Sequence, residues 1–399
     1  MDDRQLFENG IRKFVQWLDR NGTAGYDPYD LWSTSFGTRA RSLYYRFGKL
    51  AAPLVAPIIA ADSAVPRIAR LSFEKKPYAT SHAHLILAYL DLHDIAFDDE
   101  DWLSRSVELS RELDRMKISG HSGDCWGYPF DWQNRRGLWP KNTPLITVTP
   151  YCYEANMRLY GTTGDECFRE RALSTVDFAL YDLNSTERSS GSIASSYSPL
   201  DKSFVINASA YRALVLFSGA QLNTILDVEN LGHSLVEFIL DSQNGDGSWP
   251  YALEEKGDDF VDHFHTCFVL KNLLKINEIS PSSDIWKAVE KGFAYYEKEL
   301  FDVRGLPKPF AKGRGKLVKY DLCDFAEAIN LGILLRDRIP RAFEKALVIA
   351  RDVVGRFQLN DGHFVTSVGI AGLKNAVPFI RWPQAQLFHS LASLRKALD

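Results

Sequence analysis

The stretch 257–266 reads GDDFVDHFHT and is the densest run of side chains that can do chemistry. If it is helical, Asp258, Asp262 and His265 fall at i, i+4 and i+7 and share one face. A carboxylate in that place orients an imidazole and raises its basicity, which a general base needs. His263 would point in another direction, which argues against a His-x-His metal pair. The structural alternative, of equal weight, is an acidic helix N-terminus with a hydrogen-bonded histidine.

A second cluster reads CWGYPFDWQNRR and combines aromatic rings with hydrogen-bonding groups. The indoles of Trp126 and Trp132 and the ring of Tyr128 are flat faces on which a sugar can stack. Asp131 and Arg135 can bind its hydroxyl groups or a carboxylate. The alternative is a loop packed over a rim and anchored by Trp132. We favour ligand contact.

Five more positions stand at the expected starts of helices or in the loops before them. Tyr151 and Asp324 are candidate catalytic groups, and they complete a set with Asp131, Asp262 and His265. We expect Trp249, Arg381 and Trp382 to bind substrate. Arg381 can hold a carboxylate or a phosphate, and its structural alternative is to cap backbone carbonyls.

The overall composition excludes several classes of protein. The chain has 399 residues, 45% hydrophobic and 25% charged, which excludes wholesale disorder. Its formal charge is −4, so we expect no nucleic-acid partner. There are 9 Trp, 17 Tyr and 24 Phe, an abundance that suggests surfaces for a ring-shaped ligand.

The five cysteines are widely spaced and odd in number, which does not indicate a disulfide framework. The N-terminus MDDRQLFENG has no signal-peptide pattern, so a cytoplasmic location is expected. The longest apolar run, 50–61, is interrupted by Pro53 and Pro57 and is too short to span a bilayer. We expect a buried irregular segment there and no transmembrane segment. Weak contact with a membrane surface is the alternative.

Helical periodicity dominates the chain. Loops rich in glycine and aromatic residues lie between alternate helices. We expect twelve helices, with their central residues at 4–19, 79–95, 100–117, 150–160, 164–182, 202–220, 224–242, 259–278, 282–299, 321–335, 339–357 and 383–397. The marker glycines of the last four loops, from Gly191 to Gly362, are 56, 58 and 57 residues apart. That period suits a helical hairpin with its two loops.

The number of helices predicts a closed ring. Eleven helices follow an irregular insertion at 22–78, which we expect to cover one side of the ring. The helix at 4–19 can supply the missing outer partner of the helix at 383–397. Six hairpins then form an all-α (α/α)6 toroid, a single domain over 1–399, with no exposed end to cap. The inner helices start at one mouth, and we expect function there.

The motif QNGDGSW resembles the glutamine–tryptophan repeats of terpenoid cyclase and protein prenyltransferase toroids. The combination of GYDPYDLW, CWGYPFDWQ, DDFVDHFHTCFVL and RWPQAQLFHSL resembles the VpsJ-type proteins of bacterial exopolysaccharide and surface-polysaccharide biosynthesis. This resemblance implies a toroid fold and a place in polysaccharide biosynthesis. By fold, the chain also resembles six-hairpin glycosidases, uronyl lyases and uronate epimerases.

No cofactor is expected, because neither G-x-G-x-x-G nor a P-loop motif is present. One set of residues resembles the Asp-x-Cys…His zinc site of protein prenyltransferase β subunits, namely Asp321, Cys323 and His389. The glycine-rich surroundings of that site are missing. We therefore expect no metal.

Three hypotheses for function follow. The first is an enzyme that acts on an acidic saccharide, free or lipid-linked, as a glycoside hydrolase or as a uronate lyase or epimerase. The second is a non-catalytic protein that binds glycans or serves as an assembly scaffold, and that keeps the aromatic rims without an acid–base pair. Isoprenoid chemistry on the toroid is the third and the weakest, because no D-x-D-D motif is present.

Overall fold

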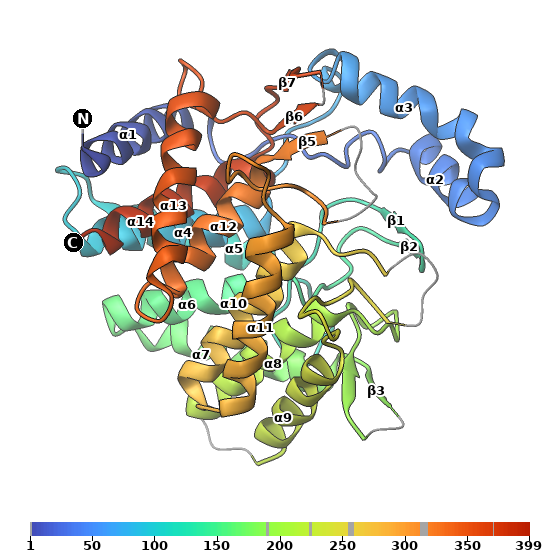
Figure 1. Ribbon diagram of the computed structural model, residues 1–399, viewed down its shortest axis with the longest axis vertical. Helices are drawn as coiled ribbons and strands as arrows, with labels where there is room; N and C mark the ends of the chain where they lie inside the picture. The colour runs from blue at the N-terminus through green and yellow to red at the C-terminus, as the bar shows by residue number, and fades with distance from the viewer. Residues whose placement is uncertain (1, 189–190, 223–225, 254–258, 312–317, 370) are drawn as a thin grey trace.

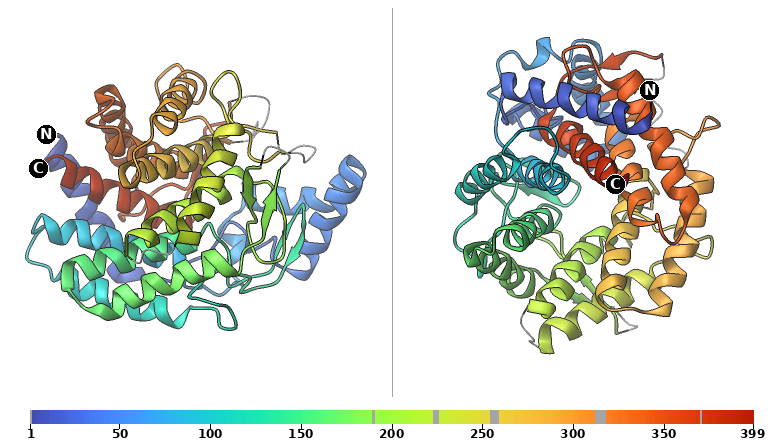
Figure 2. Two further views of the ribbon diagram at one scale, coloured as in Figure 1. Left: turned by 90° about the horizontal axis from the view of Figure 1, so that it is seen from below. Right: turned by 90° about the vertical axis from the view of Figure 1, so that its left-hand side faces the viewer.

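Six helices pack around a central axis in the computed structural model, which describes residues 2–188, 191–222, 226–253, 259–311, 318–369 and 371–399. Each inner helix contacts the next, and the last, α14, contacts the first, α4. The inner helices are α4 (Ala79–Asp94), α6 (Thr149–Thr163), α8 (Ile206–Leu222), α10 (His263–Ile279), α12 (Leu322–Leu334) and α14 (Ala385–Ala397). The ring is visible in Figure 2, right.

Six outer helices cover this ring in the described residues. They are α1 (Asp3–Asn21), α5 (Trp102–Arg115), α7 (Glu166–Tyr181), α9 (Leu226–Asp241), α11 (Ser283–Glu299) and α13 (Pro340–Asp352). The N-terminal helix α1 packs against α14 and α13, and the two chain ends lie side by side in Figure 1. The predicted (α/α)6 toroid, closed by the N-terminal helix, is therefore confirmed.

The two layers differ in how their residues are buried. In α4 every residue from Ala79 to Leu92 is buried, because this helix touches neighbours on all sides. In α5 the buried residues are Trp102, Ser106, Leu109, Ser110 and Leu113, a single stripe at helical spacing. The outer helices thus show the amphipathic period that the sequence displays, and the inner helices form the core.

The glutamine of the glutamine–tryptophan motif joins neighbouring hairpins through hydrogen bonds. The Gln243 side-chain amide donates to the carbonyls of Gly247 at 3.0 Å and of Ala288, in α11, at 2.9 Å. The Gln358 amide likewise donates to Gly10, in α1, at 2.8 Å. A Cβ on Gly247 would lie 2.4 Å from the carbonyl oxygen of Lys291, so only glycine allows this approach. The motif therefore holds each loop on the next outer helix.

Short antiparallel strands lie in the loops that lead into the inner helices. They form two hairpins and a three-stranded sheet of order β5-β6-β7. Their bounds are β1 (Trp132–Asn134), β2 (Gly137–Trp139), β3 (Ser185–Glu187), β4 (Ile193–Ser195), β5 (Val318–Asp321), β6 (Ser367–Gly369) and β7 (Lys374–Asn375).

The segment 22–78 is not irregular, contrary to our expectation. It contains α2 (Ser35–Phe47) and α3 (Ala52–Ala64), which project from the ring at the upper right of Figure 1. Pro53 lies in the first turn of α3, where no backbone N–H is needed, whereas Pro57 lies inside the helix and leaves one backbone hydrogen bond unmade. Most of the run 50–61 is exposed rather than buried, so that expectation was also wrong.

Candidate active site

A cavity of about 410 Å³ opens where the inner helices begin. Its wall includes Thr80 of α4, Tyr151 of α6, His265 of α10 and Gln386 of α14. Loops and α2 complete it, since Arg41 and Tyr45 of α2 also line it. The inner helices therefore converge on one mouth, as the loop pattern predicts.

Aromatic rings make up most of the cavity wall. Tyr128 and Trp132, both predicted to bind substrate, line it and lie edge to face at 5.7 Å between centroids. Trp382 also lines it, edge to face with Phe264 at 5.2 Å. The aromatic residues of the wall are Tyr29, Tyr45, Tyr128, Trp132, Tyr151, Tyr197, Tyr211, Tyr251, Phe260, Phe264, Phe268 and Trp382. Such a wall suits the apolar faces of sugar rings.

His265 lies on this wall and is held by Asp262. Helix α10 begins at His263, later than expected, because Asp262 is its N-cap residue. One carboxylate oxygen of Asp262 accepts from the backbone N–H of His265 at 3.0 Å, and the other bonds Nδ1 of its ring at 2.7 Å. Nδ1–H is thus the donor, and Nε2 remains as the proton acceptor. Asp258 lies outside the described residues.

Asp321 is the second titratable group of the wall, at the equivalent N-cap position of the next inner helix. Its Oδ1 accepts from the backbone N–H of Cys323 at 3.1 Å. Desolvation raises the pKa of Asp321 to about 6, and the negative charge of the nearby Asp262 also raises it. Hydrogen bonds from Cys323 and Trp382 lower the pKa but do not cancel this effect. Asp321 therefore exchanges a proton near neutral pH, as a general acid must.

Four arginines line the same cavity: Arg41 from α2, Arg135 and Arg136 from the turn between β1 and β2, and Arg381. Asp321 is the only acidic residue that faces them among the described lining residues. Arg41 donates from Nε to the hydroxyl of Tyr45 at 2.9 Å. Its Nη1 is buried with no hydrogen-bond partner within the described part of the chain. Basic groups thus outnumber the one carboxylate among the described lining residues, and a guanidinium group suits a carboxylate or phosphate ligand.

Arg381 lines the cavity, but its guanidinium is already engaged. Its Nε and Nη2 bind the two carboxylate oxygens of Asp27 at 2.6 and 3.0 Å, and its charge lies 4.5 Å from the ring centre of Tyr128. Asp27 is fully buried. Arg381 therefore anchors the segment 22–34 to the mouth, and Asp27 balances its charge.

Tyr151 and Asp324, both predicted to be catalytic, lie deeper along the axis. Tyr151 lines the cavity, and its hydroxyl bonds that of Tyr211 at 2.6 Å. Asp324 is fully buried, is not part of the cavity wall, and has no hydrogen-bond partner within the described residues. Desolvation and the carboxylates of Asp321, Asp262 and Glu327 raise its pKa well above the ordinary range. Burial and the neighbouring carboxylates thus favour the neutral form of Asp324, which lies outside the cavity wall.

Trp126 and Trp249 lie in the core, not on the cavity wall. They are 1% and 3% exposed. Their indole N–H groups donate to the carbonyls of Leu113, in α5, and of Ile239, in α9, each at 2.9 Å. Each thus caps the end of the preceding outer helix and has no face left for a sugar. Asp131 is exposed outside the cavity and accepts from the backbone N–H of Lys141 at 2.8 Å.

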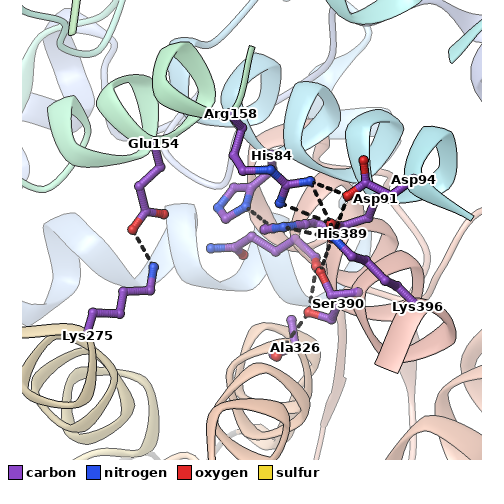
Figure 3. Close-up of polar contacts among 12 residues, drawn as sticks. His84, Asp91, Asp94, Glu154, Arg158, Lys275, Ala326, His389, Ser390 and Lys396 are labelled. Atoms are coloured by element: carbon purple, nitrogen blue, oxygen red, sulfur yellow. Dashed lines mark hydrogen bonds and ion pairs between the residues drawn. The ribbon is translucent and has the colours of Figure 1, made fainter. Parts of the chain in front are cut away.

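A second cavity of about 790 Å³ lies at the opposite end of the axis, and Tyr151 lines both. Figure 3 shows its charged groups pairing with each other. Arg158 binds Asp91 at 3.1 Å and Asp94 at 2.9 Å, and Lys275 pairs with Glu154. These charged groups therefore neutralise one another at this end of the axis.

Metal ligands do not gather in the described residues, where no group of three or more His, Cys, Asp or Glu side chains is suited to an ion. Asp321 lines the mouth cavity, whereas His389 lines the opposite cavity, where its Nδ1 bonds that of His84 at 3.0 Å. Burial lowers the pKa of His389 to about 3.

Sequence reasoning missed the position of Asp321 on the cavity wall and the contribution of α2 to that wall. One signal was available for Asp321, because it precedes its inner helix as Asp262 precedes the helix before it. Arg41 and Tyr45 carried no such signal, since no local pattern tells that α2 folds back to the mouth.

No protein-family model and no curated protein matches the sequence. Solved structures do match. An unsaturated glucuronyl hydrolase specific for heparin aligns over 99% of this chain and 97% of its own, with a TM-score of 0.64 and 10% identity. A cellobiose 2-epimerase from Spirochaeta thermophila aligns over 81% and 86%, with a TM-score of 0.61 and 12% identity.

A GH76 α-mannanase from Bacteroides thetaiotaomicron aligns over 80% of this chain and 87% of its own, with a TM-score of 0.58 and 11% identity. At these identities the likeness establishes the fold, which is the six-hairpin toroid of these carbohydrate-processing enzymes.

Proposed function

We propose that the chain is a carbohydrate-active enzyme that moves a proton on an acidic saccharide, as a uronate epimerase or lyase. The observation that carries this is that His265 and Asp321 both line one aromatic cavity, together with four arginines. Neighbouring inner helices supply the two groups, so a sugar ring in the cavity can meet both.

The chemistry follows from the groups present. Arg41, Arg135 and Arg136 neutralise the carboxylate of the uronate, which acidifies the C–H bond beside it. Nε2 of His265 removes that proton, and Asp262 stabilises the resulting imidazolium. Protonated Asp321 then protonates the departing glycosidic oxygen in elimination, or returns a proton to the carbon in epimerisation once the planar intermediate presents its other face to the acid.

Hydrolysis is the second candidate, because the raised pKa of Asp321 also suits a general acid that protonates a glycosidic oxygen. It requires a second carboxylate across the bond. Of the described lining residues only Asp321 is acidic, while Asp131 lies outside and Asp324 beneath. The arrangement therefore favours proton transfer at carbon.

The sequence resemblance to VpsJ-type proteins supports a role in bacterial polysaccharide biosynthesis or remodelling, with a free or lipid-linked saccharide as substrate. All five cysteines are free, which is consistent with the cytoplasmic location that forms part of this proposal.

Incubation with uronate-containing oligosaccharides in D₂O tests the proposal. Epimerisation introduces one deuterium at C5, elimination produces an unsaturated uronate that absorbs ultraviolet light, and hydrolysis produces only a new reducing end. We expect deuterium or unsaturation, and its loss in His265→Ala, with the exposed His233→Ala as control. Binding without any product, unchanged in His265→Ala, would identify a glycan-binding protein instead.

A further inference from the structure

The hairpin surface, by which we mean the exposed side chains of residues 35–71 on α2, α3 and the turns beside them, is unusually apolar. It holds ten of the seventeen large hydrophobic side chains that are exposed in the described residues. Leu50 is 87% exposed, Leu71 77% and Ile68 67%. Figure 2, left, shows the hairpin standing clear of the ring, at the end opposite the chain termini. Apolar patches of this kind mark interaction sites.

The same surface is strongly basic. Residues 35–71 contain six arginines and lysines and one acidic residue, Asp62. The whole chain has 47 basic and 51 acidic residues, which leaves 41 basic and 50 acidic residues outside this segment. Asp62 is paired with the buried Arg70 at 2.6 Å. Arg46, Lys49 and Arg67 are exposed and have no acidic partner within the described residues. The molecule as a whole is acidic, yet it has a local excess of positive charge beside these exposed apolar side chains.

We propose that the hairpin surface docks the protein on an anionic lipid bilayer. Apolar side chains flanked by cations fit the boundary between acyl chains and anionic headgroups. The stretch Ser35–Ala64 is apolar enough to be a candidate span, with a mean hydropathy of 1.3 in its most apolar window. It is broken at Gly48, where φ is 59°, into two helices of 13 residues. Each is about 20 Å long, short of the roughly 30 Å of a bilayer core.

This docking brings the mouth of the cavity to the membrane. Helix α2 contacts β1 and β2, and Arg41 and Tyr45 on it line the cavity while Leu43 and Phe47 are exposed. One helix thus borders both the site and the hairpin surface. If the proposed function holds, the substrate is the sugar of a lipid-linked acidic saccharide. The docking itself does not depend on catalysis.

Co-sedimentation with vesicles tests the docking. We expect the protein to bind phosphatidylcholine vesicles that contain phosphatidylglycerol, and to bind pure phosphatidylcholine far less. Arg46→Glu/Lys49→Glu and Leu50→Glu/Leu71→Glu should each reduce binding about tenfold or more. About 1 M salt should also weaken binding, because it shortens the screening length to about 3 Å. His265→Ala should bind like the wild type, which separates docking from catalysis.

Val303→Glu is the matched control, since Val303 is fully exposed but lies outside the hairpin. The hairpin variants and Val303→Glu should melt like the wild type, because their changed side chains are exposed. Equal binding to neutral and anionic vesicles, or none to either, would overturn the proposal. A dimer that Leu50→Glu dissociates, in a protein that ignores vesicles, would show that this surface pairs two copies of the chain.

Discussion

Arg381 binds Asp27 through two hydrogen bonds, across 354 positions of the chain. The pair is almost fully buried, with Asp27 0% and Arg381 4% exposed. It ties the segment that leads to α2 to the last hairpin of the ring. Arg381 thus positions one wall of the cavity, and Arg41 on α2 depends on that wall for its place.

Asp27→Asn should lower the free energy of unfolding by about 3–5 kcal/mol, because it leaves the Arg381 charge buried without a counter-ion. Urea denaturation measures this. Asp3→Asn removes a partner of Arg351 from an exposed ion pair and should cost less than about 1 kcal/mol. Equal effects of the two changes would contradict the role of the buried pair.

Asp262→Asn should reduce kcat about 10- to 100-fold, because the amide no longer stabilises the imidazolium of His265. Asparagine still caps α10, so the melting temperature should change little. His265→Ala should cost about two to four powers of ten. Substrate affinity, measured by calorimetry, should survive in both. A large loss of stability in Asp262→Asn would show that its main role is structural.

The pH profile of kcat/KM should carry a limb set by Asp321. Its pKa is raised to about 6, so the protonated form that donates is abundant below that pH and is lost as the pH rises through it. Activity should therefore fall above about pH 6. Asp321→Asn should be slower at every pH and should lack this limb. A limb that persists in Asp321→Asn belongs to another group.

Asp324 should make stability depend on pH. Its pKa in the folded state is raised above the ordinary value, so both states are protonated below about pH 4 and no penalty arises there. As the pH rises, the unfolded chain ionises first, and stability falls by about 1.4 kcal/mol per pH unit until the folded group also ionises. Between pH 5 and 9 the melting temperature should fall less in Asp324→Asn than in the wild type. This comparison holds even if the variant is less stable at every pH.

Tryptophan substitutions should separate the core from the cavity. Trp249→Ala should lower the free energy of unfolding by about 3–5 kcal/mol and leave substrate affinity unchanged, because Trp249 is 3% exposed and caps α9. Trp132→Ala should melt nearly like the wild type and bind substrate about three- to tenfold more weakly. Affinity lost in Trp249→Ala while it is still folded would contradict this division.

The closed ring was predictable from the amino-acid pattern. Helical periodicity repeats at a fixed spacing and an outer helix must bury its apolar stripe, so α1 was expected to pack beside α14 and complete the last hairpin. The sequence also identified the Asp262–His265 pair, because three positions at a helix start suffice to place a carboxylate beside an imidazole. The helical period and the Asp262–His265 spacing are both local patterns along the chain.

Which groups meet in the mouth depends on how the chain folds in three dimensions. Trp126 and Trp132 are six positions apart in one motif, yet one caps an outer helix and the other faces the cavity, because the loop turns between them. The pKa of Asp321 depends on desolvation by other hairpins, and the partner of Arg381 lies at the other end of the chain. Burial and charge are summed over neighbours in space, and no spacing along the sequence encodes that sum.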